Sequence, residues 1–159
     1  MEEVIKLSRS TVEKYLSCPR CCVLDKKYKI KPPSLPFTLN IAVDTLCKNE
    51  FDYYREIQEP HPLFIKHGIE AVPFRHKDID TWRSNFKGIR YKSQNYNYDF
   101  GGAVDDVWQK KNGELVIVDV KATSKINFDW IDTFNKYDYA KAYKRQLEMY
   151  QWLFRKNGF

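Results

Sequence analysis

The sequence predicts one domain of mixed α/β (α+β) class that spans residues 1–159. Three observations support this prediction: two apolar segments joined by an Asn-Gly turn, a long amphipathic helix before them, and a second long helix after them. A chain of 159 residues is long enough to form one hydrophobic core. Its 43% hydrophobic and 30% charged residues are typical of a folded protein and argue against disorder.

Capping and periodicity indicate helices in the first third of the chain. Ser10, followed three positions later by Glu13, forms a capping-box pattern that predicts the start of a short helix. A second short helix is expected over residues 18–28, and three prolines favour an extended connection over residues 29–36. A longer helix is expected over residues 39–55, because its apolar residues fall in one broad arc.

Two acids, Asp44 and Glu50, lie within the apolar arc of this long helix. An acid in such a position is either a solvated group or a buried ligand of a metal ion. Both interpretations stay open for Asp44, and the ligand interpretation is weaker for Glu50.

Residues 56–98 carry weaker signals. Prolines divide residues 56–86 into loops, with a short helix expected around Ile65. Residues 87–98 are rich in Lys, Arg, Tyr and Asn, and we expect a strand there with a basic flank. This segment is either a nucleic-acid contact or a solvated strand.

A β-hairpin is the clearest local prediction. Residues 100–109 and 114–122 are expected to form two strands joined by an Asn-Gly turn. The length of the turn decides which acid of the first strand faces Asp119. A two-residue turn places Asp106 opposite Asp119, whereas a three-residue loop places Asp105 there. The local pattern leaves both registers open.

The last predicted helix spans residues 138–156 and follows an irregular stretch. Asp138 is its expected N-cap and Gly158 its expected C-cap. Gln146 shares one face of this helix with apolar and aromatic residues, namely Tyr139, Tyr143, Tyr150 and Leu153. We therefore expect Gln146 to be a buried amide that needs hydrogen-bond partners.

Asp119 and Lys121 are the most informative pair in the chain. They lie two positions apart at the end of an apolar strand, so their side chains share one face. Burial of two charges is costly unless they are paired or functional. Together with Asp105 or Asp106 on the partner strand, they are expected to form a divalent-metal site suited to phosphodiester hydrolysis. The alternative is an ion pair at a strand end.

The composition limits the classes of partner. A net charge of +6 favours a polyanion, and 16% aromatic residues beside Lys and Arg suit stacking on unpaired bases. No apolar run reaches the roughly 20 residues of a membrane span, and the N-terminus lacks the apolar core of a signal peptide. We expect a cytoplasmic protein with no membrane association.

Four cysteines occur, at positions 18, 21, 22 and 47. Cys18 and Cys21 have the spacing of half a zinc knuckle, but the sequence holds no second C-x-x-C pair. We expect reduced thiols that are buried or at helix ends. A zinc-stabilised interaction domain built on Cys18, Cys21 and Cys47 is a weaker hypothesis.

Four segments of the chain form an ordered set. Leu7–Cys21 reads as a serine-capped helix that runs into Cys-Pro, and Gly102–Val107 as a Gly-x-hydrophobic-Asp strand. Val118–Thr123 holds an acid-x-lysine motif, and Gln146–Tyr150 a Q-x-x-x-Y motif on a helix. In this order the set resembles the PD-(D/E)XK nuclease superfamily, and in particular its RecB-like branch. The resemblance spans almost the whole chain.

This resemblance implies a restriction-endonuclease-like α-β-β-β-α-β core, with a central mixed β-sheet flanked by helices. It aligns Asp105 with a metal ligand, which favours the three-residue loop. The histidine that the branch often carries before the sheet is replaced by residues 41–46, so Asp44 is expected to stand in for it. The strand that usually follows the last helix is expected to come from a longer chain or a partner protein.

The resemblance also implies cleavage of DNA with Mg²⁺ or Mn²⁺. It implies no iron–sulfur cluster, because no cysteine follows Cys47. Asp105, Asp119 and the carbonyl oxygen of Val120 are expected to hold the ion, with Asp44 as a further ligand.

Three other side chains complete the expected site. Lys121 is expected to stabilise charge on the phosphate, and Gln146 and Tyr150 to position the nucleic-acid backbone. Basic side chains after the hairpin either bind flanking phosphates or are solvated, namely Lys125, Lys141, Lys144 and Arg145. The expected function is a metal-dependent DNA nuclease, and the alternative is a catalytically inactive nucleic-acid-binding module of the same fold.

Overall fold

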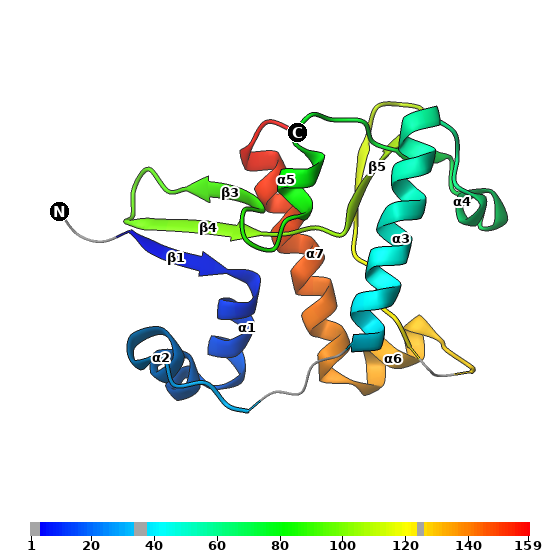
Figure 1. The fold of residues 1–159 in the computed structure, drawn as a ribbon. Coiled ribbons are helices and arrows are strands. Elements are labelled where there is room, and N and C mark those ends of the chain that lie inside the picture. Colours follow the sequence, from blue (N-terminus) through cyan, green and yellow to red (C-terminus); the bar gives the residue numbers. More distant parts are fainter. Residues whose placement is uncertain (1–3, 34–37, 124–125) are drawn as a thin grey trace.

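The computed structural model describes residues 4–33, 38–123 and 126–159, and these form a mixed α/β structure (Figure 1). Its elements are, in order, β1 (Ile5–Ser8), α1 (Arg9–Ser17), α2 (Pro19–Tyr28), α3 (Thr38–Ile57), α4 (Pro62–Lys66), β2 (Ala71–Pro73), α5 (Ile79–Arg83), β3 (Ile89–Lys92), β4 (Tyr98–Gly102), β5 (Asp106–Lys110), β6 (Leu115–Val118), α6 (Trp130–Lys136) and α7 (Asp138–Lys156). The predicted fold class is therefore confirmed at this level. None of the described helices is long and apolar enough to cross a membrane.

The described strands form two small sheets in place of one central sheet. The first has the order β1-β4-β3, with β1 parallel to β4 and β3 antiparallel to it. The second has the order β2-β5-β6 and is antiparallel throughout. The single strand predicted over residues 100–109 is therefore wrong. It divides into β4 and β5, because the buried Val104 between them donates its N–H to the carbonyl of Trp82 over 3.1 Å.

The hairpin of β5 and β6 has the longer of the two predicted loops. Asp106 pairs with Val118, and Lys110 N–H donates to the Glu114 carbonyl over 2.9 Å. Gly113 closes the three-residue loop with a φ of 86°, in the left-handed region that glycine adopts at little cost. The same register places Asp105 opposite Asp119.

Three predicted helices are confirmed with small shifts in their ends: α2, α3 and α7. The cap of α1 is two residues earlier than predicted, since the Ser8 hydroxyl accepts the Thr11 N–H over 3.3 Å. Helix α7 begins at Asp138 itself, so Tyr137 occupies the N-cap position predicted for Asp138. The stretch expected to be irregular contains α6, which is capped by the Asp129 carboxylate.

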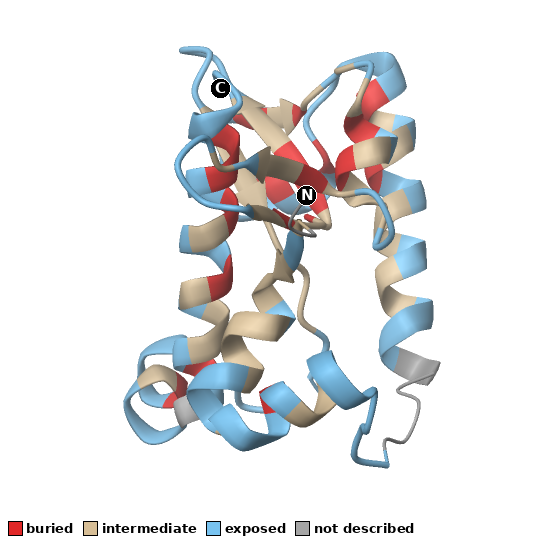
Figure 2. Cartoon of the chain, turned by 90° about the vertical axis from the view of Figure 1, so that its left-hand side faces the viewer, coloured by how far each residue is buried: buried red, intermediate tan, exposed pale blue. Residues whose placement is uncertain are grey.

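The core joins α5 and α7 to strands of both sheets. Its buried members are Ile79, Trp82, Ile89, Val104, Val107, Tyr150, Leu153 and Phe154. Figure 2 shows most buried residues around the strands and the adjoining turns of the long helices. A Cβ atom at Gly102 would lie only 2.3 Å from Tyr150 Cε1. The absence of a side chain at Gly102 therefore lets α7 lie close against β4.

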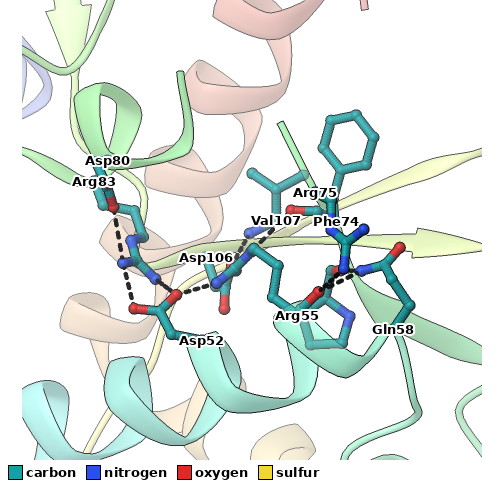
Figure 3. A network of polar contacts seen from close by, with 10 residues as sticks. Asp52, Arg55, Gln58, Phe74, Arg75, Asp80, Arg83, Asp106 and Val107 are labelled. Carbon is teal, nitrogen blue, oxygen red and sulfur yellow. Dashed lines mark hydrogen bonds and ion pairs between the residues drawn. The ribbon is translucent and has the colours of Figure 1, made fainter. Parts of the chain in front are cut away.

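A buried ionic network fixes α3 to β5 and α5 (Figure 3). Arg55 pairs with Asp106, which is fully buried, and with Asp52. Arg83 donates to both carboxylate oxygens of Asp52 over 2.7 Å. Arg55 also donates to the Phe74 carbonyl over 2.8 Å. Burial raises the pKa of Asp106 more than the Arg55 charge lowers it. Asp106 is thus a structural acid.

Candidate active site

Asp105 and Asp119 form an acid pair at the end of the hairpin. The Asp105 Oδ2 atom accepts the Val120 N–H over 2.7 Å, which fixes this carboxylate against the segment that follows β6. Burial, followed by the negative charge of Asp119, raises the pKa of Asp105 to about 6. The fold therefore holds two acids near each other at a cost in free energy, a common property of functional sites.

Asp119 is the more enclosed of the two acids, with a side chain that is 4% exposed. Its Oδ1 atom accepts a hydrogen bond from Gln146 Nε2 over 2.7 Å, and its Oδ2 atom forms an ion pair with Lys121. Lys121 Nζ lies 5.2 Å from the centroid of the Tyr143 ring, so it also makes a cation–π contact. The structure thus brings Asp105, Asp119 and Lys121 together.

Gln146 and Tyr150 extend this cluster along α7. Gln146 is 3% exposed, and its Nε2 atom lies 3.2 Å from the Tyr150 hydroxyl. The predicted buried amide is therefore confirmed. Its Oε1 atom is buried and has no hydrogen-bond partner among the described residues. A hydrogen-bond donor or a cation beside this acceptor would satisfy it.

Helix α3 contributes an acid and a lysine. Lys48 Nζ lies 2.8 Å from Asp44 Oδ2 and 3.8 Å from Asp105 Oδ1, so Lys48 stands between these two acids. The other oxygen of Asp44 is buried without a partner among the described residues. Glu50 Oε2 instead lies 3.5 Å from His61 Nε2, and the structure places Glu50 apart from this cluster.

The acids of this cluster carry oxygen ligands, but among the described residues they are not gathered around one point. The described residues contain no ready group of three or more His, Cys, Asp or Glu around one point, so Asp44, Asp105 and Asp119 are not a closed ligand set. The three carboxylates are nevertheless balanced by only two ammonium groups, because Lys48 pairs with Asp44 and Asp105 and Lys121 pairs with Asp119. Carboxylate oxygens and an unpaired amide oxygen are the ligands that Mg²⁺ and Mn²⁺ prefer. Val120, expected to offer its carbonyl, is seen to use its N–H toward Asp105.

A pocket with basic residues in its walls adjoins Tyr150. Its volume is about 220 Å³, and Arg9, Lys87, Arg90 and Tyr150 are among its lining residues. Arg90 also binds Asp99, over 2.9 Å. Lys87 and Arg90 belong to residues 87–98, for which a nucleic-acid contact and a solvated strand were both left open.

The basic residues after the hairpin are less uniform than expected. Arg145 donates to both carboxylate oxygens of Glu13 over 2.8 Å, so much of its charge is neutralised within the protein. Lys144 lies 3.8 Å from Glu148 at the surface, and Lys141 is exposed. Lys125 lies outside the described residues.

The cysteines follow the expected placement at helix ends and in the interior. Cys18 caps α2, and its sulfur accepts the Cys21 N–H over 3.2 Å. Cys22 is buried, Cys47 is half-buried, and none of the four forms a disulfide. Cys18 lies between α1 and α2, Cys21 and Cys22 lie on α2 with Cys21 exposed, and Cys47 lies on α3.

Sequence reasoning missed Lys48, which interacts with both Asp44 and Asp105. The available signal was its position four residues after Asp44, where two helical side chains meet.

No family model matches the chain, and comparisons with curated proteins and with solved structures gave no match either.

Proposed function

We propose that this chain is a metal-dependent deoxyribonuclease of the RecB-like PD-(D/E)XK type, with a restriction-endonuclease-like fold. One observation carries the proposal: Asp105, Asp119 and Lys121 meet at the end of one hairpin, with Gln146 hydrogen-bonded to Asp119. Each of these side chains was expected at such a site from its motif. The net positive charge of +6 is suited to a nucleic-acid substrate.

The acids would hold the ion, and α7 would set their geometry. Asp105 and Asp119, with Asp44 next to them, would bind Mg²⁺ or Mn²⁺ through carboxylate oxygens. When bound, such an ion lowers the pKa of a coordinated water and polarises the scissile phosphate. Gln146 fixes the orientation of the Asp119 carboxylate through the 2.7 Å hydrogen bond.

Lys121 and the basic pocket would act on the substrate. The Lys121 ammonium group, which is paired with Asp119 and more exposed than it, would stabilise the negative charge that develops on the phosphate. Arg9 and Lys87, in the pocket beside Tyr150, would bind the adjoining phosphates. These contacts would align the strand with the acids.

Digestion of end-labelled linear DNA and of circular DNA, with Mg²⁺ or Mn²⁺, tests this function. We expect cleavage by the natural chain and at least a roughly 100-fold loss in Asp119→Asn and Lys121→Met. Asp80→Asn and Lys144→Met are matched controls at exposed positions and should keep full activity. All five proteins are purified in parallel, so a contaminating nuclease would appear in each. Full activity in Asp119→Asn would refute the proposal.

A nucleic-acid-binding module without catalysis is the second candidate. Lys48 favours it, because this ammonium group already lies between Asp44 and Asp105, where a cation would otherwise balance them. DNA binding without cleavage across a titration of both metals would support this candidate over the enzyme.

A further inference from the structure

An aromatic pocket lies directly beside Lys121. Its volume is about 430 Å³, and its walls include Lys121 together with Phe128, Trp130, Tyr139 and Tyr143. These residues come from the end of the hairpin, from the segment before α6, and from the helices α6 and α7. We refer to this space as the aromatic pocket.

The rings of the aromatic pocket are supported by each other and are still open to solvent. Phe128 and Trp130 meet edge to face at 5.0 Å, and Trp130 stacks on Phe134 at 5.3 Å. Phe128, Trp130 and Tyr139 nevertheless remain 38%, 46% and 46% exposed. Exposed aromatic faces held in place by neighbouring rings are suited to stacking on a flat ligand.

Lys121 connects the aromatic pocket to the acid pair. It forms its ion pair with Asp119 and lines the pocket, where it contacts the Tyr143 ring at 5.2 Å. A ligand that stacks on these rings is therefore separated only by the Lys121 side chain from the place where the phosphate is proposed to react. The parts of a nucleotide that adjoin its phosphate are the sugar and the base.

An unpaired base fits this arrangement and a paired base does not. In a duplex both faces of each base are covered by its stacked neighbours, so the rings could reach a base only after it had left the stack. Bases of a single strand offer their faces freely. We propose that the aromatic pocket binds one unpaired base of the strand that is cleaved at Asp105 and Asp119. This inference rests on the nuclease function proposed above, and it makes single-stranded DNA the preferred substrate.

Binding measured without divalent metal tests the pocket separately from catalysis. Fluorescence anisotropy in EDTA would compare three labelled probes of about 12 nucleotides: a single strand, the same strand with abasic residues, and the duplex. We expect the natural chain to bind the base-bearing strand roughly tenfold more tightly than the abasic strand, and also more tightly than the duplex. Equal affinity for the normal and abasic strands would overturn the inference.

Variants locate the effect in the pocket. Trp130→Ala and Tyr139→Ala should each remove most of the preference for the base-bearing strand, and Trp130→Phe should restore it because a ring remains. Phe86→Ala is the matched control, since Phe86 is 97% exposed and is not among the pocket residues. Circular dichroism confirms that each variant is folded. A preference that persists in folded Trp130→Ala and Tyr139→Ala would also overturn the inference.

The outcomes separate the two proposals. Base-dependent binding without cleavage in Mg²⁺ or Mn²⁺ would support the proposed base-binding pocket and contradict the proposed nuclease function. Cleavage that depends on Asp119 but is equal for normal and abasic strands would support the nuclease function and contradict base binding in the aromatic pocket. Binding of the duplex as tightly as the single strand would also contradict base binding in this pocket.

Discussion

Gln146 donates a hydrogen bond from Nε2 to Asp119 Oδ1 over 2.7 Å, and this contact connects the last helix of the chain to the strand that carries the acid-x-lysine motif. The two residues are 27 positions apart in sequence. Their contact makes the orientation of Asp119 depend on where α7 lies.

Replacing Gln146 by alanine should therefore impair catalysis more than folding. Without the amide, the Asp119 carboxylate loses a fixed partner, and we expect cleavage to fall by roughly 10- to 100-fold. The measurement is the initial rate at saturating metal, beside thermal unfolding. Gln151→Ala, an exposed glutamine on the same helix, is the control and should leave the rate unchanged. An unaltered rate in Gln146→Ala would exclude a positioning role.

Asp105 should destabilise the metal-free fold at neutral pH. Its pKa is about 6 in the folded state against 3.8 as a free side chain, so folding disfavours its charged form. This cost is full above pH 6, shrinks as the pH falls, and is absent below pH 3.8. Asp105→Asn should thus raise the free energy of unfolding by roughly 1–3 kcal/mol at pH 8, with little gain near pH 4.

Urea unfolding of both proteins at the two pH values, in EDTA, checks this prediction. A stabilisation of the same size at both pH values would mean that the charge of Asp105 is not its cause. Adding Mg²⁺ at pH 8 should stabilise the natural chain more than Asp105→Asn.

Asp44 and Glu50 should respond differently to metal. Asp44 is joined to Asp105 through Lys48, whereas Glu50 faces His61. Asp44→Ala should raise the Mg²⁺ concentration needed for half-maximal cleavage by about tenfold, since one oxygen ligand is lost. Glu50→Ala is the matched control, and its Mg²⁺ titration should overlay that of the natural chain. Identical titrations for both variants would remove Asp44 from the ligand set.

The Arg55–Asp106 pair should matter for stability and not directly for chemistry. Arg55→Ala leaves the fully buried Asp106 charge without its main partner, which should cost about 3–5 kcal/mol of unfolding free energy. Lys110→Ala breaks an exposed ion pair with Glu114 and should cost less than about 1 kcal/mol. Urea unfolding measures both. Equal losses for the two variants would contradict a special role for the buried pair.

Local sequence rules predicted the elements with strong periodicity or turn chemistry. The long helix near Asp44 and the last helix were found close to their expected bounds. The hairpin turn lies where it was expected, but its strands are shorter than the predicted 100–109 and 114–122. The registers of the hairpin could not be separated by local rules, because Asn-Gly suits both a two-residue turn and the end of a three-residue loop. The resemblance to a nuclease family favoured the register that the structure has.

The remaining elements depend on contacts between distant residues. Strands β1 and β2 have only 4 and 3 residues, too few to show a period, and each is defined by its partner strand. The break between β4 and β5 arises from the hydrogen bond that Val104 N–H donates to the Trp82 carbonyl, and no sequence pattern near Val104 predicts this bond. The roles of Arg55 and Lys48 likewise follow from the packing of α3.

The three-residue loop of the hairpin sets a register in which two adjacent acids face different partners, Asp105 facing Asp119 and Asp106 facing Arg55. Deleting one residue between Lys110 and Glu114 would exchange these two orientations. The guanidinium group of Arg55 would then meet the wrong carboxylate, and the acid cluster would lose its matching member. A shorter version of this turn could be tolerated only if both acids moved one position along the strand. The length of this turn and the positions of the two acids would therefore have to change together during evolution or design.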